Sequence, residues 1–275
     1  QRQMCIRDRS ATAGPGLLGG LLVGVVAGKT LAHYLNKPFI AVNHLEGHAL
    51  SIKLEREIEY PYLLLLVSGG HTEYTIIKNF NNYKRIGTTI DDAAGEAFDK
   101  LSRYCGFGFP GGPAIQKIGD GGDETKIDFP RPKTSNKFDY SFSGLKTAAI
   151  YYLQGLPDDQ PISKKDFAAS YQEAIVDSLM SIFEKAVKET NVPTISGGGG
   201  VMANSRLREK LMIFSEVEDK ELLLPSPKLS TDNAAMIAMV GLEKFKKSEF
   251  SELSHPAIPR WPLDAVSYTH LRAHE

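Results

Sequence analysis

Two histidines four residues apart are the side chains in this sequence best suited to binding a metal ion. His44 and His48 stand at the start of an expected helix, directly after the short apolar segment 39–42. Residues four apart lie on one face of a helix, about one turn from each other. Imidazole suits iron, zinc, nickel and copper. Because two histidines leave such an ion under-coordinated, we expect a third ligand, and Asp232 is the best candidate.

The sequence leaves two interpretations of Asp232 open. It stands just before an expected final helix, residues 233–247, so it could be a helix N-cap. Alternatively, its carboxylate completes a site of two histidines and one carboxylate with open positions for a substrate. The order His-x-Glu-x-His differs from the His-Glu-x-x-His of zinc proteases. Glu46 is two residues from each histidine, so we expect it to point away from the metal face.

Two glycine-rich turns could approach a phosphate or a flat ring. Ser68-Gly69-Gly70-His71 follows the apolar strand expected at 62–67, and its backbone N–H groups could hold phosphate oxygens, although a simple hairpin turn explains it nearly as well. Gly197-Gly198-Gly199-Gly200 stands between an expected strand and a helix, where glycine permits close approach at a helix N-terminus. Asn204 could bind a base or ribose, or cap its helix.

Acidic residues open the helix expected at 92–104. Asp91 and Asp92 fall where the helix dipole favours negative charge, whereas Asp99 falls two turns further in. A carboxylate there could bind the two hydroxyls of a ribose. The rigid turn Gly108-Phe109-Pro110-Gly111-Gly112-Pro113 could lie against the same sugar.

A group of cations surrounds the aromatic segment 138–142. Such an arrangement can follow a phosphate backbone and stack on bases, although a solvated loop is the simpler interpretation. The candidate RNA contacts are Lys126, Arg131, Lys133, Lys137 and Lys146.

The composition limits the class of protein. The chain has 275 residues and a net charge of −1, so any nucleic acid must bind a local patch rather than a global basic field. Two cysteines, Cys5 and Cys105, cannot form a disulfide framework and point to a reducing compartment. The longest apolar run, residues 17–27, is broken by glycines and is too short to span a membrane.

The expected elements define an α/β fold containing hairpins, without internal repeats. Residues 1–10 and 265–275 show no periodic pattern, and we interpret both as non-native tails. We expect strands at 39–42, 62–67, 73–78, 194–196 and 222–224, and helices at 14–35, 92–104, 144–153, 164–188, from 203 and at 233–247. A loop with one short helix is expected at 106–136.

Six motifs occur in the order seen in one family, the tRNA N6-adenosine threonylcarbamoyltransferases, once called glycoproteases. The chain resembles the bacterial and mitochondrial branch from about residue 11 to residue 264. The motifs are His44-Leu45-Glu46-Gly47-His48, Leu66-Val67-Ser68-Gly69-Gly70-His71-Thr72, Asp91-Asp92-Ala93-Ala94-Gly95-Glu96-Ala97-Phe98-Asp99-Lys100, Phe142-Ser143-Gly144-Leu145-Lys146-Thr147, Gly199-Gly200-Val201-Met202-Ala203-Asn204 and Thr231-Asp232-Asn233.

The resemblance implies the two-lobed nucleotide-binding fold of actin, hexokinase and Hsp70 (ASKHA). Residues 11–60 with 232–264 would form the first lobe and 61–231 the second. In the family an opening strand and hairpin precede the segment that matches residue 11, so we expect a fragment whose first lobe is incomplete. Its unpaired sheet edge predicts poor stability or aggregation.

The resemblance also implies the site and the reaction. His44, His48 and Asp232 would bind one divalent metal, Fe²⁺ or alternatively Zn²⁺. The threonylcarbamoyl group of threonylcarbamoyl-AMP would pass to adenosine 37 of tRNA, releasing AMP. A degenerate paralogous subunit and a small P-loop ATPase are the expected partners, in the cytoplasm. The residues implied to hold threonylcarbamoyl-AMP are Leu66, Val67, Ser68, Gly69, Gly70, Asp99, Gly112 and Asn204.

Three other functions fit parts of the pattern. The glycine loops permit an ATP-dependent kinase or ATPase of the same fold, in which the histidine pair has no role. The pair also suggests a metalloprotease, for which Glu46 is misplaced. A non-catalytic nucleotide-binding scaffold would not be expected to keep three metal ligands.

Overall fold

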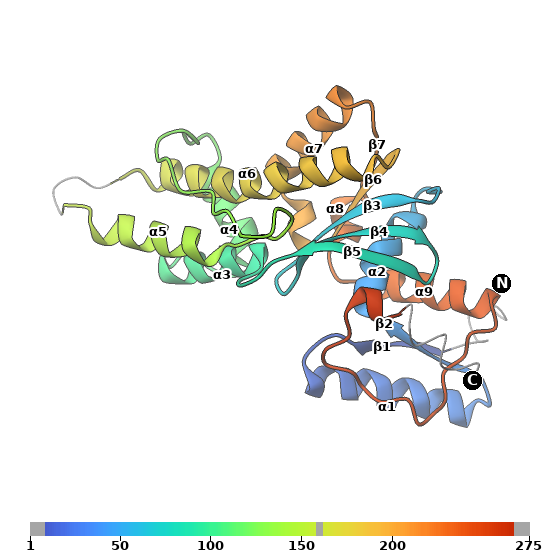
Figure 1. Cartoon of the computed structure of the whole chain (residues 1–275). Helices are drawn as coiled ribbons and strands as arrows, with labels where there is room; N and C mark the ends of the chain where they lie inside the picture. The colour runs from blue at the N-terminus through green and yellow to red at the C-terminus, as the bar shows by residue number, and fades with distance from the viewer. Residues whose placement is uncertain (1–8, 158–161, 267–275) are drawn as a thin grey trace. The chain divides into compact units, whose positions relative to one another are not determined.

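The computed structural model describes residues 9–157 and 162–266 and divides the chain into two compact units (Figure 1). Within the described residues, the first unit contains 9–60, 77–84 and 232–266, and the second contains 61–76, 85–157 and 162–231. Each unit is therefore built from segments that are distant in the sequence. The expected tails at residues 1–8 and 267–275 lie outside the described residues.

The first unit combines residues 9–60 with residues 232–266 around a small sheet. Strands β1 and β2 pair in parallel, and α1 packs against β1 (Figure 1). A small apolar core forms where Ile40, Val42 and Leu50 meet Phe80 and Val240. The elements are β1 (Arg9–Gly14), α1 (Leu18–Tyr34), β2 (Phe39–Asn43), α2 (His44–Leu50), η2 (Ser51–Leu54), α9 (Ala234–Lys246) and η4 (Leu263–Ala265).

The second unit is organised on a sheet with the order β5-β4-β3-β6-β7. Strand β3 pairs in parallel with β6, and β6 with β7. The alternate residues Leu63, Leu65 and Val67 enter the main core with side chains from α3, α5 and α6. The elements are β3 (Tyr62–Val67), β4 (Thr72–Asn79), β5 (Asn82–Thr88), α3 (Ala94–Tyr104), α4 (Gly111–Gly119), α5 (Ser143–Gln154), α6 (Lys164–Thr190), β6 (Thr194–Gly198), η3 (Gly200–Ala203), α7 (Ser205–Val217), β7 (Glu221–Leu223) and α8 (Pro227–Ser230).

Most of the expected elements are present, although strand β1 and the short helix α8 were not expected from the sequence. Arg9 and Ser10 pair with Phe39 and Ile40, and Val266 is buried, so these parts of the expected tails are ordered, and their non-native origin stays a prediction. Strand β5 was not expected from the sequence, because its alternation of polar and apolar residues is short. Gly197 and Gly198 belong to β6 rather than to a loop. The hairpin tip at 77–84 lies with the first unit, although the analysis placed it in the second lobe.

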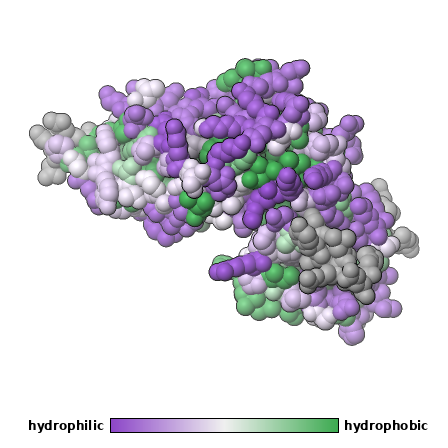
Figure 2. All heavy atoms as spheres, in the orientation of Figure 1, coloured by the Kyte–Doolittle hydropathy of each residue, from purple (hydrophilic) through white to green (hydrophobic). Residues whose placement is uncertain are grey.

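Helix α1 carries apolar side chains on its exposed surface, over which Figure 2 shows hydrophobic residues gathered. Val23 is 74% exposed and Val26 is 56% exposed, so this helix is apolar on more than its packed face. The poor stability or aggregation expected from an unpaired sheet edge stays a prediction. In the described part of the chain, no helix is long and apolar enough to cross a membrane.

Candidate active site

His44, His48 and Asp232 converge in the first unit. Asp232 Oδ1 lies 3.3 Å from His44 Nε2 and 3.1 Å from His48 Nε2. Both histidines come from α2, which begins immediately after the buried strand β2. Their rings meet edge to face with centroids 4.8 Å apart. The spacing of the two histidines thus produces one face with two nitrogens directed at a single carboxylate.

The position of Asp232 depends on its neighbour. Asn233, not Asp232, is the N-cap of α9, and its side chain accepts a hydrogen bond from the Met236 backbone N–H at 2.9 Å. Asp232 is therefore free of the capping role that the sequence left open. Its side chain is 75% exposed, whereas that of His48 is fully buried. The carboxylate stands at the open edge of the histidine pair.

The donor set fits a divalent transition metal. Two imidazoles and a carboxylate suit iron or zinc. The three ligand atoms lie within 4.8 Å of one another. The two nitrogen–oxygen distances resemble the edges of a coordination shell with bonds of about 2.1 Å. Hydrogen bonds from His44 and His48, in that order of size, hold the pKa of the Asp232 carboxyl well below its ordinary value despite opposing desolvation.

A hollow of about 770 Å³ borders this group within the first unit. β1, α1 and α9 line it, and His44 and Asp232 lie on its wall. Much of the lining is apolar or glycine, including Gly20, Gly24 and Leu21. Two of the three candidate ligands, His44 and Asp232, are therefore accessible from this hollow.

In the second unit, the candidate phosphate turn packs against two glycines. A Cβ atom on Gly199, whose φ is +91°, would lie 2.3 Å from the Val67 carbonyl oxygen. A Cβ on Gly95 would lie 2.6 Å from the Ser68 carbonyl oxygen. Since Leu66 is in register with Gly198, the carboxyl ends of β3 and β6 lie side by side there. Ligands of α/β sheets commonly bind beyond the carboxyl ends of the strands.

The turn itself is held by Ser68. Its hydroxyl accepts hydrogen bonds from the backbone N–H groups of His71 at 3.0 Å and Gly70 at 3.3 Å. Gly69 and Gly70 are exposed, with nothing within 4 Å of a Cβ built on either. The turn is therefore ordered internally and open outward. The sequence analysis did not foresee that Ser68 uses one of the glycine N–H groups.

Asp99 lies on α3, Gly112 on α4 and Asn204 at the N-cap of α7. Asp99 Oδ1 accepts a hydrogen bond of 2.6 Å from the Gly111 backbone N–H at the start of α4. Asn204 caps α7 through Leu207 N at 3.0 Å and donates to Gln172 Oε1 at 2.8 Å. Both side chains therefore have structural partners. The cap is the simpler of the two interpretations of Asn204, and binding of a sugar or base stays a prediction.

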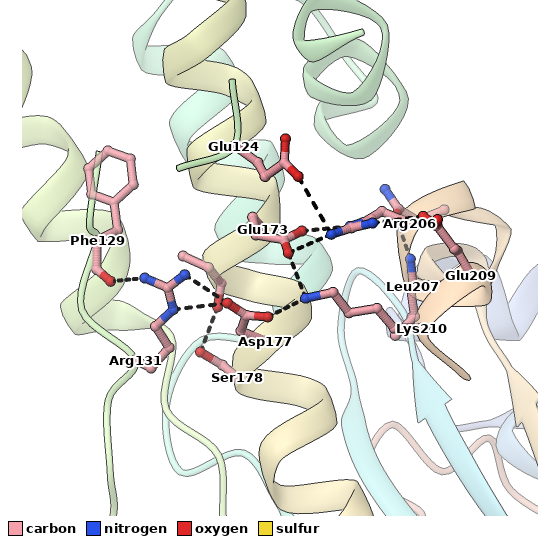
Figure 3. A network of polar contacts seen from close by, with 12 residues as sticks. Glu124, Phe129, Arg131, Glu173, Asp177, Ser178, Arg206, Leu207, Glu209 and Lys210 are labelled. Atoms are coloured by element: carbon pink, nitrogen blue, oxygen red, sulfur yellow. Dashed lines mark hydrogen bonds and ion pairs between the residues drawn. The ribbon is translucent and has the colours of Figure 1, made fainter. Parts of the chain in front are cut away.

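The five candidate RNA contacts divide into two groups. Lys146 pairs with Asp92 at 2.9 Å, and Lys137 pairs with Glu189. Arg131 Nη2 lies 2.7 Å from Asp177 Oδ2, within the polar network that Figure 3 shows between α6 and α7. Lys126 and Lys133 are exposed and make no ion pair within the described residues. These two lysines are the cations most available to a phosphate backbone.

Asp91 has a role that the sequence analysis missed. Its carboxylate accepts hydrogen bonds from the Ser141 and Ser143 hydroxyls, both at 2.6 Å, and from the Phe142 N–H at 2.8 Å. Although desolvation opposes it, these bonds lower the pKa of Asp91. Asp91 thus anchors the start of α5, and nothing in the local sequence indicated a role other than opening α3.

Known proteins resemble this chain along most of its length. The profile of the tRNA N6-adenosine threonylcarbamoyltransferase family matches residues 10–239. A protein of that name from Pelagibacter ubique is 51% identical over 263 residues, which cover 93% of this chain and 73% of the relative. One from Paramagnetospirillum magneticum is 46% identical over 267 residues, covering 94% and 76%. This chain belongs to the tRNA N6-adenosine threonylcarbamoyltransferase family. The resemblance inferred from the six motifs is confirmed, and the family is one of transferase enzymes that modify tRNA.

Solved structures confirm the fold class. Full-length HypF in its phosphate- and nucleotide-bound form matches with a TM-score of 0.61 and 14% identity, covering 82% of this chain and 46% of HypF. HypF of T. kodakarensis matches with a TM-score of 0.63 and 12% identity, covering 85% and 40%. At these identities the likeness concerns the fold alone, which is α/β and of the ASKHA type.

Proposed function

We propose that this chain transfers the threonylcarbamoyl group of threonylcarbamoyl-AMP to the exocyclic amine of adenosine 37, in tRNAs that read codons beginning with adenine. The observation that carries the proposal is the convergence of His44 and His48 with Asp232, 184 residues further along the chain than His48. The names of the relatives support the transferred group and the tRNA acceptor. An ATP-dependent kinase of this fold has no use for these three ligands.

In this proposal the three residues hold one divalent ion, Fe²⁺ with Zn²⁺ as the alternative. When bound, such an ion supplies Lewis acidity and a template that orients the reacting group. The buried His48 fixes one ligand position, and the exposed Asp232 leaves the outer side of the site accessible. The chain's own contribution is therefore a rigid pair of nitrogens and a carboxylate at an open edge.

The glycine turn binds the leaving group in this proposal. Backbone N–H groups near Gly69 would donate to the phosphate of the adenylate, while Asp99 would accept from the ribose hydroxyls. Leu66, Val67, Ser68, Gly70, Gly112 and Asn204 complete the proposed binding residues. The amine nitrogen bonds to the carbamoyl carbon, the bond from that carbon to the phosphate oxygen breaks, and the amine loses a proton as AMP leaves. No covalent intermediate with the protein is needed.

The proposed partners follow from the reaction. tRNA is the acceptor and threonylcarbamoyl-AMP the donor, and we extend the proposal to a paralogous subunit and a small P-loop ATPase in the cytoplasm. Lys126 and Lys133 are the proposed tRNA contacts best supported by their exposure. Arg131, Lys137 and Lys146 would first have to leave their acidic partners.

The test is nucleoside mass analysis of unmodified tRNA after incubation with threonylcarbamoyl-AMP, Fe²⁺ and the proposed partner subunits. We expect threonylcarbamoyladenosine in the digest, at the nucleotide 3′ of the anticodon. The 51% identical relative from Pelagibacter ubique, run in parallel, serves as the positive control. Modified tRNA from the relative and none from this chain, when folded and metal-loaded, would contradict the proposal. Phosphate transfer from ATP instead would favour the kinase.

A further inference from the structure

Glu46 lies between the two candidate histidine ligands but faces the opposite way. At 100° per residue, its side chain points about 180° away from the midpoint of His44 and His48 on α2. Accordingly Glu46 is fully buried, whereas His44 is partly exposed. A buried carboxylate is costly unless charges and hydrogen bonds compensate it. Its partners therefore decide which way α2 faces.

Those partners come from two other segments of the first unit. Tyr83, on β5, donates a buried hydrogen bond of 2.7 Å from its hydroxyl to Glu46 Oε1. Lys244, on α9, places Nζ 3.4 Å from Glu46 Oε2. This second contact is an ion pair whose geometry falls short of a hydrogen bond. Lys244 is only 4% exposed, so both charges are withdrawn from water and depend on each other.

The surrounding contacts hold the ends of α2 and its distance from α9. Asn43 caps the helix through Leu45 N at 2.8 Å and donates to the Trp261 carbonyl at 2.9 Å. A Cβ on Gly47 would lie 3.0 Å from Ile237, so the two helices pack closely. These contacts fix where α2 begins and how near α9 it lies. Glu46 adds polar contacts from the middle of α2 to β5 and to α9.

The ring of His48 lacks the usual outer support. A metal-binding histidine commonly donates its second ring nitrogen to a carboxylate or carbonyl, which sets the orientation of the ring. His48 Nδ1 is buried and has no hydrogen-bond partner in the described part of the chain. Its ring must therefore be directed by packing and by the orientation of α2.

We propose that Glu46, Tyr83 and Lys244 are positioning residues that lock the rotation of α2 and so direct His44 and His48 at one metal ion. The inference rests on the proposed metal site. In this proposal the two contacts of Glu46 on the opposite face of α2 take the place of a hydrogen bond to the second ring nitrogen of His48. It also explains why an acidic residue stands between the two candidate metal ligands in the sequence, although its side chain is buried away from the site and cannot reach a substrate.

The test measures Co²⁺ binding to the metal-free chain by calorimetry and by visible absorption. We expect Glu46→Gln and Lys244→Met to weaken Co²⁺ binding by about tenfold or more, as loss of outer support does in other metal sites. Lys244→Arg, which keeps the cation, should restore parental affinity. Hydrogen exchange provides a second, metal-free readout, in which the amides of α2 should exchange faster in Lys244→Met than in the parent.

Two controls separate positioning from general destabilisation. Glu173→Gln removes a largely buried acid from an ion-pair network in the other unit, so it should lower stability without changing Co²⁺ affinity. Glu46→Leu with Lys244→Leu leaves no uncompensated buried charge and should fold even where a single variant does not. We expect this double variant to bind Co²⁺ weakly. Parental Co²⁺ affinity together with unchanged α2 exchange in folded Glu46→Gln, in folded Lys244→Met or in the double variant would overturn the inference.

The outcome also distinguishes this inference from the metal assignment. A parent chain that binds no Co²⁺ would refute the proposed metal site. Faster exchange confined to α2 would then still support the lock on helix rotation, and unchanged exchange would refute it too.

Discussion

Asp232 Oδ1 lies 3.1 Å from His48 Nε2, across 184 residues of sequence, while the adjacent Asn233 caps helix α9. Asn233 thus serves as the helix cap and Asp232 as the candidate metal ligand, although either residue type can cap a helix. The cap satisfies a free N–H of the helix, and Asp232 is left to face the histidines. Substituting each residue in turn therefore separates an effect on the candidate metal site from an effect on the stability of α9.

Asp232→Ala should abolish stoichiometric metal binding, because it removes the carboxylate that closes the histidine pair. Asn233→Ala should retain the metal and lose about 1 kcal/mol of stability, as is typical when an N-cap is removed. Metal content by elemental analysis and unfolding by urea measure the two effects. Equal metal content in the two variants would contradict the assignment of Asp232 as a ligand.

Gly199→Ala should destabilise the second unit strongly. Its φ of +91° disfavours any side chain, and a Cβ would clash with the Val67 carbonyl oxygen at 2.3 Å. The combined backbone strain and overpacking predict a loss of about 3 kcal/mol or more. Gly200→Ala is the matched control, since nothing lies within 4 Å of its Cβ, and should change stability by about 0.5 kcal/mol or less. Urea midpoints that shift equally for the two variants would show that the close approach is absent.

Lys126→Ala combined with Lys133→Ala should weaken tRNA binding and reduce its salt dependence. Removing one lysine–phosphate ion pair lowers the slope of log affinity against log salt by about 0.7 to 0.9. Fluorescence anisotropy over a range of salt concentrations measures that slope. In contrast, Lys146→Met should mainly lower stability, because Lys146 pairs with Asp92 at 2.9 Å. A larger loss of tRNA affinity from Lys146→Met than from the double variant would contradict this prediction.

The sequence predicted local structure well where one signal dominated. The fully apolar strand at 62–67 was placed to the residue, because a continuous apolar run bounded by turns has few alternatives. The histidine spacing likewise predicted a shared helix face, and Glu46 faces away from it as expected. The choice between cap and ligand at Asp232 stayed open, since either role needs only a carboxylate before a helix.

Contacts between residues far apart in the chain could not be predicted from the sequence. Nothing local indicates that Lys146 meets Asp92 or that Tyr83 meets Glu46, because both interactions depend on how the chain packs. The five cations between residues 126 and 146 therefore could not be told apart in the sequence. In the structure, Arg131, Lys137 and Lys146 have acidic partners, whereas the other two make no ion pair within the described residues. Short elements were also missed, as with β5, whose pairing rather than its composition makes it a strand.

Glu173 predicts how stability should depend on pH. Its desolvation alone would raise its pKa, but hydrogen bonds from Arg206 and Lys210, together with their charges, lower it from 4.5 to about 2. A carboxyl whose pKa is lowered by folding stabilises the protein above its unfolded pKa and loses that effect as the pH falls toward its folded pKa. The contribution is up to about 3 kcal/mol near neutral pH and should disappear between about pH 4.5 and pH 2.

Glu173→Gln should therefore be less stable than the parent at pH 7, with a difference that shrinks as the pH falls through this window. Urea unfolding at a series of pH values measures it. Glu189→Gln is the matched control, because Glu189 forms an exposed pair with Lys137, and such pairs contribute little. A stability difference for Glu173→Gln that is the same at pH 7 and at pH 2.5 would mean that the carboxylate charge does not stabilise the packing of α6 against α7. The loss would then come from the geometry of the amide instead, and the network in Figure 3 would act through packing rather than through charge.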